Sequence, residues 1–316
     1  MYRVLGELGC ELPEFMEGNK MSIFTGAGVA IVTPMYEDGS VNYDKLEKLI
    51  DYQIDNGTDC IVICGTTGES STLSEEEHSE CIRAAVAFTK GRVPVVAGTG
   101  SNATYTAVDL TVKAEKDGAD AALIVTPYYN KATQSGLIEH YTEIARKTSL
   151  PIILYNVPSR TGVNIQPETA VTLAKTCDNI VAVKEAAGDI SQAAHLMQLA
   201  DGCLDMYCGN DDQILPYLAL GGIGVISVLS NICPQDTHDI VARFLEGDVK
   251  GSRDLQLRAF PLIQELFNEV NPIPVKTAMN LLGWDVGPLR LPLNKMSAAH
   301  EEALKKAMIE YGLKLA

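Results

Sequence analysis

Short runs of apolar residues, rich in valine and isoleucine, recur along the chain. Longer stretches with a helical period of apolar and polar positions separate them. The runs occupy residues 29–32, 60–64, 93–97, 121–125, 151–155, 180–183, 204–208 and 224–228. Because most of them are apolar at nearly every position, they predict strands buried on both faces, as in a parallel sheet.

The stretches between the runs predict amphipathic helices. Residues 44–56 place four apolar side chains on one helical face. Ser74, with Glu77 three residues later, has the pattern of a capping box that opens the next helix. Eight strand–helix units at this spacing predict an α/β fold, the (β/α)8 or TIM barrel. A doubly wound sheet fits less well, because no glycine-rich phosphate fingerprint follows the first strand.

From about residue 246 the pattern is purely helical, with turn signals at Gly247 and Gly283. We therefore expect a catalytic barrel over residues 21–246 and a C-terminal helical appendage over residues 247–316. Residues 1–20 lack the basic start and apolar run of a signal peptide, and are expected to be an extension outside the core. No apolar run reaches the length of a membrane-spanning helix, so no transmembrane helix is expected. The cysteines, interpreted as free thiols, favour a reducing cytoplasm.

The charge balance narrows the classes of partner. The chain of 316 residues has 25 Lys and Arg against 41 Asp and Glu, a formal net charge of −16. This excess disfavours nucleic acids and anionic membranes, and an anionic substrate would need a local cation. The eight cysteines form no CxxC pair and are expected to be buried free thiols. The five histidines lack metal-ligand spacing, so no metal is expected.

In a barrel of this type the catalytic groups lie at the carboxyl ends of the strands. Lys184 directly follows the run at 180–183. A lysine at a strand end often just marks a solvated loop, but here it would point into the barrel mouth among apolar neighbours. Partial loss of hydration leaves more neutral amine to attack a ketone. Tyr155, at the end of the preceding run, offers a phenol that can move protons, although a lone tyrosine more often packs. The pattern predicts cofactor-free Schiff-base chemistry at Lys184.

Two further loops offer anion-binding groups. Gly65-Thr-Thr-Gly-Glu69 follows the second run, and its hydroxyls and amide N–H groups can hold a carboxylate, although an ordinary turn fits equally well. Arg160, in a Pro-Ser-Arg-Thr-Gly loop after the fifth run, offers a bidentate grip on a carboxylate; the alternative is a surface arginine. Together these loops favour an anionic substrate that carries a carboxylate.

Seven motifs occur in a fixed order, each weak alone and highly specific together. They are Val29-Ala-Ile-Val-Thr-Pro34, Gly65-Thr-Thr-Gly-Glu-Ser70, Thr126-Pro-Tyr-Tyr-Asn130, Tyr155-Asn-Val-Pro-Ser-Arg-Thr-Gly162, Val183-Lys-Glu185, Gly224-Val-Ile-Ser227 and Asn271-Pro-Ile-Pro-Val-Lys276. With these motifs the chain, from about residue 24 to its C-terminus, resembles the dihydrodipicolinate synthase family. That family belongs to the pyruvate-dependent Schiff-base aldolases, which also include N-acetylneuraminate lyase.

The resemblance implies an activity and a set of catalytic residues. The activity is condensation of pyruvate with L-aspartate 4-semialdehyde to 4-hydroxy-tetrahydrodipicolinate, in the diaminopimelate route to lysine. Such enzymes are classified as carbon–oxygen lyases, although their chemistry is that of a class I aldolase. Lys184 would form the Schiff base. Thr66, Tyr129 and Tyr155 would relay protons, with Tyr129 reaching across a dimer interface.

The same resemblance implies the substrate contacts and the assembly. Thr67 and the backbones of Gly209 and Ile226 match the groups that position pyruvate, and Arg160 matches the residue that binds the carboxylate of the semialdehyde. The family is usually a homotetramer built as a dimer of dimers.

Lysine-inhibited members of the family carry a regulatory site at the dimer interface. The matching residues here are Ser70, Ser71, His78, Asn102 and Tyr128. Two positions depart from the inhibited pattern: Thr106 stands where a glutamate commonly contacts the inhibitor, and Glu75 stands where histidine is frequent. An ammonium that loses a buried carboxylate partner loses affinity. We therefore expect weak or absent feedback by lysine, unless Glu75 substitutes.

Two other functions stay open from the sequence. The first is a lyase of the same superfamily that cleaves a sialic acid or a 2-keto-3-deoxy sugar acid. Arg160 disfavours it, because the sialic-acid branch generally lacks this arginine. The second is a non-catalytic barrel that binds a keto acid, which the presence of Lys184, Tyr155, Thr66 and Tyr129 disfavours.

Overall fold

The computed structural model describes residues 22–316, so the predicted extension at residues 1–20 lies outside the described part of the chain. Eight parallel strands form a closed barrel in chain order, and β1 pairs with β8 to complete it. The strands are β1 (Gly26–Ala30), β2 (Cys60–Ile63), β3 (Val95–Gly98), β4 (Ala121–Val125), β5 (Ile152–Asn156), β6 (Ile180–Glu185), β7 (Asp205–Cys208) and β8 (Gly224–Ser227). The predicted (β/α)8 barrel is confirmed.

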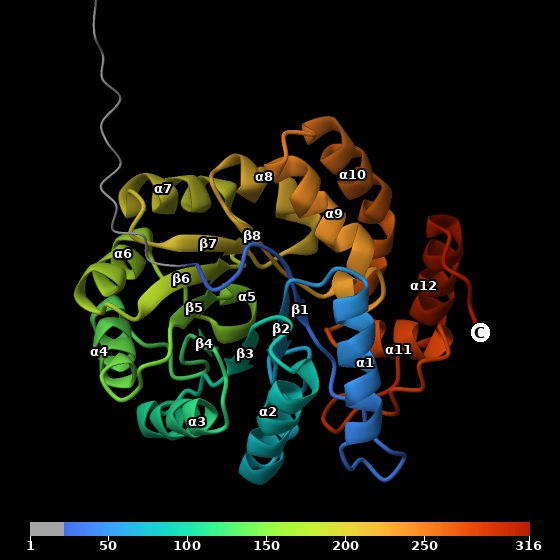
Figure 1. Ribbon diagram of the computed structural model, residues 1–316, viewed down its shortest axis with the longest axis horizontal. Coiled ribbons are helices and arrows are strands. Elements are labelled where there is room, and N and C mark those ends of the chain that lie inside the picture. The colour runs from blue at the N-terminus through green and yellow to red at the C-terminus, as the bar shows by residue number, and fades with distance from the viewer. Residues whose placement is uncertain (1–21) are drawn as a thin grey trace, which may run out of the picture.

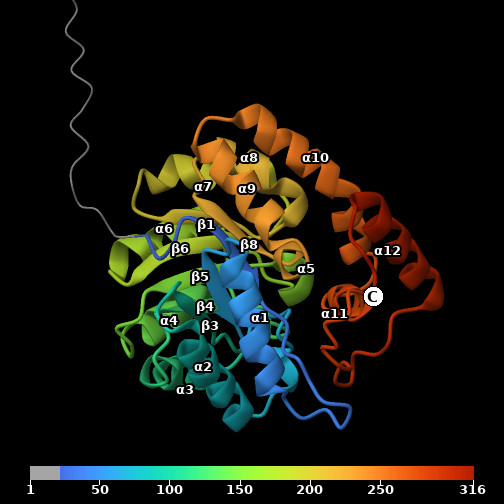
Figure 2. The same ribbon diagram turned by 45° about the vertical axis from the view of Figure 1, so that its right-hand side comes forward.

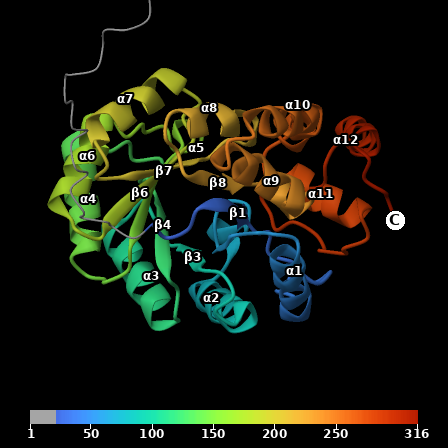
Figure 3. The same ribbon diagram turned by 45° about the horizontal axis from the view of Figure 1, so that its top comes forward.

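Helices surround the strands, as Figures 1 and 3 show. The helices that follow the strands are α1 (Tyr43–Asp55), α2 (Glu75–Thr89), α3 (Thr104–Lys116), α4 (Gln134–Ala145), α5 (Pro158–Thr161), α6 (Pro167–Thr176), α7 (Ile190–Ala200), α8 (Ile214–Ala219) and α9 (Pro234–Leu245). Three 3-10 turns are η1 (Ser70–Thr72), η2 (Asp211–Gln213) and η3 (Leu229–Asn231). The capping box at the start of α2 is confirmed, with Ser74 accepting from the Glu77 amide and Glu77 accepting from the Ser74 amide.

Three more helices follow the barrel: α10 (Val249–Leu266), α11 (Ile273–Leu281) and α12 (Ala298–Tyr311). This C-terminal region is helical, as expected, and Figures 1 and 2 show α11 and α12 packed on one side of the barrel. Helix α10 packs along α9 and α12. Among the described residues no helix is long and apolar enough to cross a membrane.

The core has two layers. Aliphatic side chains from the outer faces of the strands pack against the helices, and a second buried cluster fills the inside of the barrel. Phe24, just before β1, stacks on Tyr207 with ring centroids 4.4 Å apart, and the Tyr207 hydroxyl donates to the Phe24 carbonyl (2.7 Å). The filled interior leaves the carboxyl ends of the strands as the place for a site.

Strand β1 begins three residues earlier than the apolar pattern predicted. Gly26 lies opposite Gly224 of β8, and a Cβ on Gly224 would stand 2.2 Å from the Gly26 carbonyl oxygen. Only glycine permits so close a backbone approach. At this point the barrel closes through two glycines, which have no hydrophobic signal.

Candidate active site

A cavity of about 160 Å³ opens at the carboxyl ends of the barrel strands. The predicted residues that line it are Thr66, Thr67, Tyr155, Arg160, Lys184 and Gly209. They come from the loops or ends of β2, β5, β6 and β7. Six of the eight residues proposed for catalysis and substrate binding therefore face one cavity.

Strand register places Lys184 and Tyr155 side by side. Tyr155 of β5 pairs directly with Lys184 of β6, and the Lys184 Nζ lies 4.3 Å from the centre of the Tyr155 ring. Both side chains are buried, with Lys184 6% exposed. Strand β6 extends to Glu185, so the backbone of Lys184 is part of the strand and not of a loop. A buried amine beside a phenol has the arrangement that imine formation and proton transfer need.

The turn after β2 presents two threonines to this amine. Its backbone folds back on itself, with the Gly68 amide donating to the Gly65 carbonyl (3.1 Å). The Thr33 hydroxyl donates to the Gly68 carbonyl (2.7 Å) and ties the turn to the end of β1. The Thr67 hydroxyl accepts from the Asn271 side-chain amide (3.0 Å). These contacts hold the turn at the cavity wall, which both threonines line.

Arg160 stands on the single-turn helix α5, which the sequence pattern did not predict as helical. Pro158 opens this turn, and Gly162 ends it with a positive φ of 71°. One Arg160 nitrogen donates to the Asn271 carbonyl (3.3 Å). A guanidinium has five N–H donors, so this contact orients the group and leaves donors for a carboxylate.

Gly209 has room for no side chain. A Cβ there would lie 2.6 Å from the Ala186 Cβ, and the Gly209 amide donates to the Glu185 carbonyl (2.8 Å). Its backbone therefore approaches the cavity closely. Ile226, the other predicted backbone contact, lies in the buried cluster inside the barrel.

Asp211 and Glu185, the residue that follows Lys184 on β6, are buried carboxyl groups near Lys184. Burial raises the pKa of Asp211, while hydrogen bonds from Ser227 and two backbone amides and the charge of Lys184 act in the opposite direction. Burial also raises the pKa of Glu185, whose oxygens accept from Asn156 and Gln192. Within residues 22–316 no group of three or more His, Cys, Asp and Glu side chains is arranged to hold a metal ion.

Tyr129 does not reach the cavity of its own chain. It is 89% exposed, and its backbone has a φ of 75°, an uncommon value for a tyrosine. The Tyr129 amide donates to the Thr161 carbonyl (3.4 Å), which fixes the loop beside α5. The neighbouring Tyr128 is also partly exposed.

The proposed regulatory residues lie near the starts of α2 and α3 and in the loop after β4. Ser70 and Ser71 form η1, and the His78 Nε2 lies 2.8 Å from the Gly98 carbonyl oxygen. Burial lowers the pKa of His78, which favours the neutral ring. The Asn102 carbonyl accepts from the Asn130 side chain (2.8 Å) and links this loop to the Tyr128–Tyr129 segment.

The C-terminal region supplies cavity residues that the sequence reasoning missed. Asn271 and Phe267 line the cavity, and Asn271 contacts both Thr67 and Arg160. The available signal was the Asn271-Pro-Ile-Pro-Val-Lys276 motif, to which no role had been given. Ser159 and Asn210 also line the cavity, next to predicted residues.

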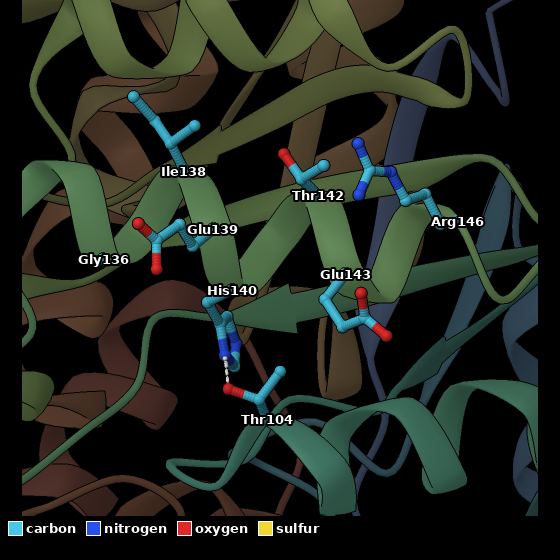
Figure 4. A pocket seen from close by; sticks show the side chains of 8 residues that line it. All are labelled: Thr104, Gly136, Ile138, Glu139, His140, Thr142, Glu143 and Arg146. Atoms are coloured by element: carbon cyan, nitrogen blue, oxygen red, sulfur yellow. Dashed lines mark hydrogen bonds between the residues drawn. The ribbon is translucent and has the colours of Figure 1, made fainter.

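A second depression lies along α4 and the start of α3 (Figure 4). The His140 Nδ1 contacts the Thr104 hydroxyl there (2.9 Å), and the His140 ring is nearly fully buried. The depression contains none of the residues predicted for catalysis or substrate binding. The cavity at the strand ends is therefore the candidate active site.

The chain is similar to known proteins along most of its length. The profile of the Dihydrodipicolinate synthetase family matches residues 23–310. A 4-hydroxy-tetrahydrodipicolinate synthase of Lachnoclostridium phytofermentans is 64% identical over 293 residues, which cover 93% of this chain and 100% of the relative.

Solved structures agree with this match. A dihydrodipicolinate synthase from Aquifex aeolicus has a TM-score of 0.90 and 45% identity, covering 92% of this chain and 99% of the other. One from Cyanidioschyzon merolae with lysine bound has a TM-score of 0.90 and 41% identity, covering 93% of this chain and 100% of the other. The chain belongs to the dihydrodipicolinate synthetase family.

Proposed function

We propose that the protein condenses pyruvate with L-aspartate 4-semialdehyde to 4-hydroxy-tetrahydrodipicolinate, through a Schiff base on Lys184. The observation that carries the proposal is the direct register pairing of Lys184 with Tyr155 in a cavity that Arg160 also lines. Family membership supports the same reaction. The reaction belongs to the diaminopimelate route to lysine.

The first half-reaction prepares pyruvate as a nucleophile. The Lys184 amine attacks the keto carbon, and loss of water leaves an imine. Tyr155, whose ring lies 4.3 Å from the Lys184 Nζ, supplies and removes protons in this step, with Thr66 as the next member of the relay. The Thr67 side chain and the backbones of Gly209 and Ile226 hold the pyruvate carboxylate. Loss of a methyl proton then gives an enamine.

The second half-reaction uses the aldehyde. The enamine carbon attacks the aldehyde carbon, which takes up a proton as a hydroxyl while the imine to Lys184 re-forms. The amino group that the semialdehyde brought then attacks the imine carbon, which closes the ring and releases the Lys184 amine. Arg160, which lines the same cavity, holds the carboxylate of the semialdehyde. The sialic-acid or sugar-acid alternative lacks this use for Arg160 and is less well supported.

The test is borohydride reduction in the presence of pyruvate, followed by peptide mass mapping. We expect a reduced pyruvate adduct on Lys184 in the parent protein and none in Lys184→Ala. Tyr155→Phe should form the adduct more slowly, because the phenol proton is gone. An adduct on another lysine, or no adduct at all, would contradict the mechanism.

We further propose a homotetramer built as a dimer of dimers, in which Tyr129 completes the partner's relay. The support is its 89% exposure and the fact that it does not line the cavity of its own chain. We also propose a cytoplasmic location, supported by the seven free cysteines among the described residues, since thiols persist in a reducing compartment.

We propose that lysine feedback is weak or absent, although Ser70, Ser71, His78, Asn102 and Tyr128 resemble a lysine site. Glu75 was the residue that could replace the missing carboxylate at Thr106. In the structure its carboxylate pairs with Lys113 (2.6 Å). An ion pair already made reduces its availability to a ligand ammonium, and this supports the proposal.

A further inference from the structure

Lys276 is the last residue of the motif that begins at Asn271, and it has no role in the reaction as proposed. It lies on α11, and its side chain is 1% exposed. Its ammonium contacts three oxygens: Glu69 Oε1 (2.9 Å), the Thr33 carbonyl (3.2 Å) and the Pro288 carbonyl (2.5 Å). An ammonium has three donors, so this buried charge is fully hydrogen-bonded.

Its partner Glu69 closes the turn that carries Thr66 and Thr67. The Glu69 amide donates to the Thr66 carbonyl (3.1 Å), and the Glu69 backbone is left-handed, with a φ of 55°. A non-glycine residue takes this conformation at a cost, which the surroundings must offset. The second carboxylate oxygen accepts from the Arg290 amide (3.0 Å). Both oxygens of Glu69 are therefore held by the C-terminal region.

The segment that leads into α11 makes a second contact with the turn. Asn271, two residues before the helix begins, donates to the Thr67 hydroxyl (3.0 Å). The turn is thus fixed at Thr67 by the start of this segment and at Glu69 by Lys276. Thr66 lies directly before these two anchors and faces the same cavity as Lys184.

Stability alone is a poor reason for this arrangement. Burial lowers the pKa of Lys276, and the charge of Glu69 acts in the opposite direction. Removing two charges from water offsets most of their attraction, so a buried ion pair adds little net stability over well-packed neutral groups. Such a pair does define a geometry, because any conformation that separates the two buried charges is strongly unfavourable.

We propose that the Glu69–Lys276 pair is a positioning element, which holds Thr66 and Thr67 in the geometry that imine formation requires. The inference deepens the proposed function and rests on it for the roles of the two threonines. Misplacement of a reacting group by about 1 Å can cost about 100-fold in rate. The pair acts through the turn and does not touch the substrate.

The test compares the parent with the double variant Glu69→Gln/Lys276→Met. Lys276→Met alone would leave a buried carboxylate unpaired and disturb folding, whereas the double change removes both charges. We expect about the parental melting temperature, a fall in kcat of about tenfold to 100-fold and a higher KM for pyruvate. The KM for the semialdehyde should stay within about twofold, because Arg160 stands on a different loop.

The matched control is Glu301→Gln/Lys305→Met, which removes an ion pair of α12 (2.7 Å) with no contact to the turn. Its kinetics should equal those of the parent. A folded Glu69→Gln/Lys276→Met protein with parental kcat and pyruvate KM overturns the proposal, and so does an equal rise in both KM values. If the double variant does not fold, Glu69→Gln alone replaces it, with parental kinetics again the overturning result.

Failure of the proposed function would be visible separately, because the parent itself would then form no reducible adduct with pyruvate. Hydrogen exchange reads the positioning role without any activity. Residues 65–70 should exchange faster in the double variant than in the parent, while α12 stays unchanged. Equal exchange of residues 65–70 in the two proteins would count against the pair as a positioning element.

Discussion

Arg160 resolves a conflict between the charge of the protein and the charge of its proposed substrates. The formal net charge is −16, whereas pyruvate and the carboxyl end of the semialdehyde are anionic. The long-range electrostatic interaction between the protein and these substrates is therefore repulsive, and binding must depend on local hydrogen-bond donors and cations. Arg160 is a cation on the cavity wall, oriented by one hydrogen bond to the Asn271 carbonyl.

We predict that Arg160→Ala lowers kcat/KM for the semialdehyde by about 100-fold, since charge-assisted hydrogen bonds contribute about 2–3 kcal/mol. Borohydride trapping of pyruvate on Lys184 should stay close to the parental level. Steady-state kinetics and trapping measure the two effects. Arg146→Ala, in the depression of Figure 4, serves as the control and should change neither. Equal damage to trapping and to the semialdehyde step would contradict the assigned role.

His140 gives the fold a specific dependence on pH. Its ring is buried beside Thr104 (Figure 4), and burial lowers the pKa of His140 from 6.5 to about 4. Between about pH 4 and pH 6.5, His140 is mostly protonated in the unfolded chain and mostly neutral in the folded chain. The free energy of unfolding therefore falls as the pH drops through this window.

At pH 5 this single group should lower the free energy of unfolding by about 2 kcal/mol relative to pH 7. The measurement is urea unfolding of the parent and of His140→Asn at both pH values. Asparagine can keep a hydrogen bond to Thr104 but does not titrate, so the variant should lose less stability between pH 7 and pH 5. Identical losses in the two proteins would show that His140 is not the group responsible.

The residues that meet at the site were predictable only where local sequence gave a reason. Lys184, Tyr155 and Arg160 each follow a recognisable strand, so the barrel topology alone brings them to one mouth. Asn271 is different, because it contacts Thr67 across 204 positions of the chain. No periodicity connects residues so far apart. Only tertiary packing of the C-terminal region does.

At the level of elements, the apolar runs predicted all eight strands but not their ends. Strand β3 was expected from residue 93 and begins at Val95, while β6 continues past the apolar run through Lys184 and Glu185. Strand ends are set by hydrogen-bond register with the neighbours, here the pairing of Lys184 with Tyr155 and Tyr207. Side-chain hydrophobicity does not report that register.

Helix α2 begins at a capping box that also carries a long-range contact. Ser74 caps the helix, and its partner Glu77 accepts from Arg290 of the C-terminal region (2.7 Å between Nη1 and Oε2). The local signal fixes the helix start, and the arginine ties that start to the rest of the molecule. The arginine contact was not predictable from the sequence near α2.

We predict that Ser74→Ala lowers the free energy of unfolding by about 1 kcal/mol, because the Glu77 amide loses its acceptor. Ser74→Thr keeps the hydroxyl and should lose only a few tenths of a kcal/mol, by the ranking of capping residues. Denaturant unfolding of both variants measures the difference. A loss in Ser74→Thr as large as that in Ser74→Ala would show that the cap hydroxyl is not the cause.

At the scale of the whole molecule, the residues proposed for regulation and for assembly lie close to one another. The residues that resemble a lysine site lie beside the exposed Tyr128–Tyr129 segment, to which Asn130 links Asn102. A lysine-bound structure of a 41% identical relative makes the site worth testing in this chain. Here Thr106 offers no charge, and Glu75 is paired with Lys113.

We predict no half-inhibition by lysine in the micromolar range. Thr106→Glu should lower the half-inhibiting lysine concentration by at least about tenfold, because it restores a carboxylate for the ligand ammonium. Thr106→Gln is the matched neutral control and should leave inhibition unchanged. Initial rates at increasing lysine concentration decide the matter. Micromolar half-inhibition of the parent protein would refute the hypothesis.

Assembly enters the chemistry if Tyr129 acts in the partner subunit, as its exposure supports. Lys184→Ala lacks the nucleophile and Tyr129→Phe lacks one relay group, so each variant alone should be nearly inactive. In a mixed dimer, one cavity would combine Lys184 from the Tyr129→Phe chain with Tyr129 from the Lys184→Ala chain. This cavity is complete only because a two-fold interface exchanges the tyrosines between the subunits.

Co-expression of the two variants in equal amounts should therefore restore about a quarter of the parental activity, since about half of the dimers are mixed and each has one complete cavity of two. The control is co-expression of Lys184→Ala with Tyr155→Phe. Lys184 and Tyr155 act in the same cavity of one chain, so the mixed dimer has no complete site and no activity should return. If Tyr129 acts within its own chain, the first mixture must stay as inactive as the second, because every cavity then contains one defect.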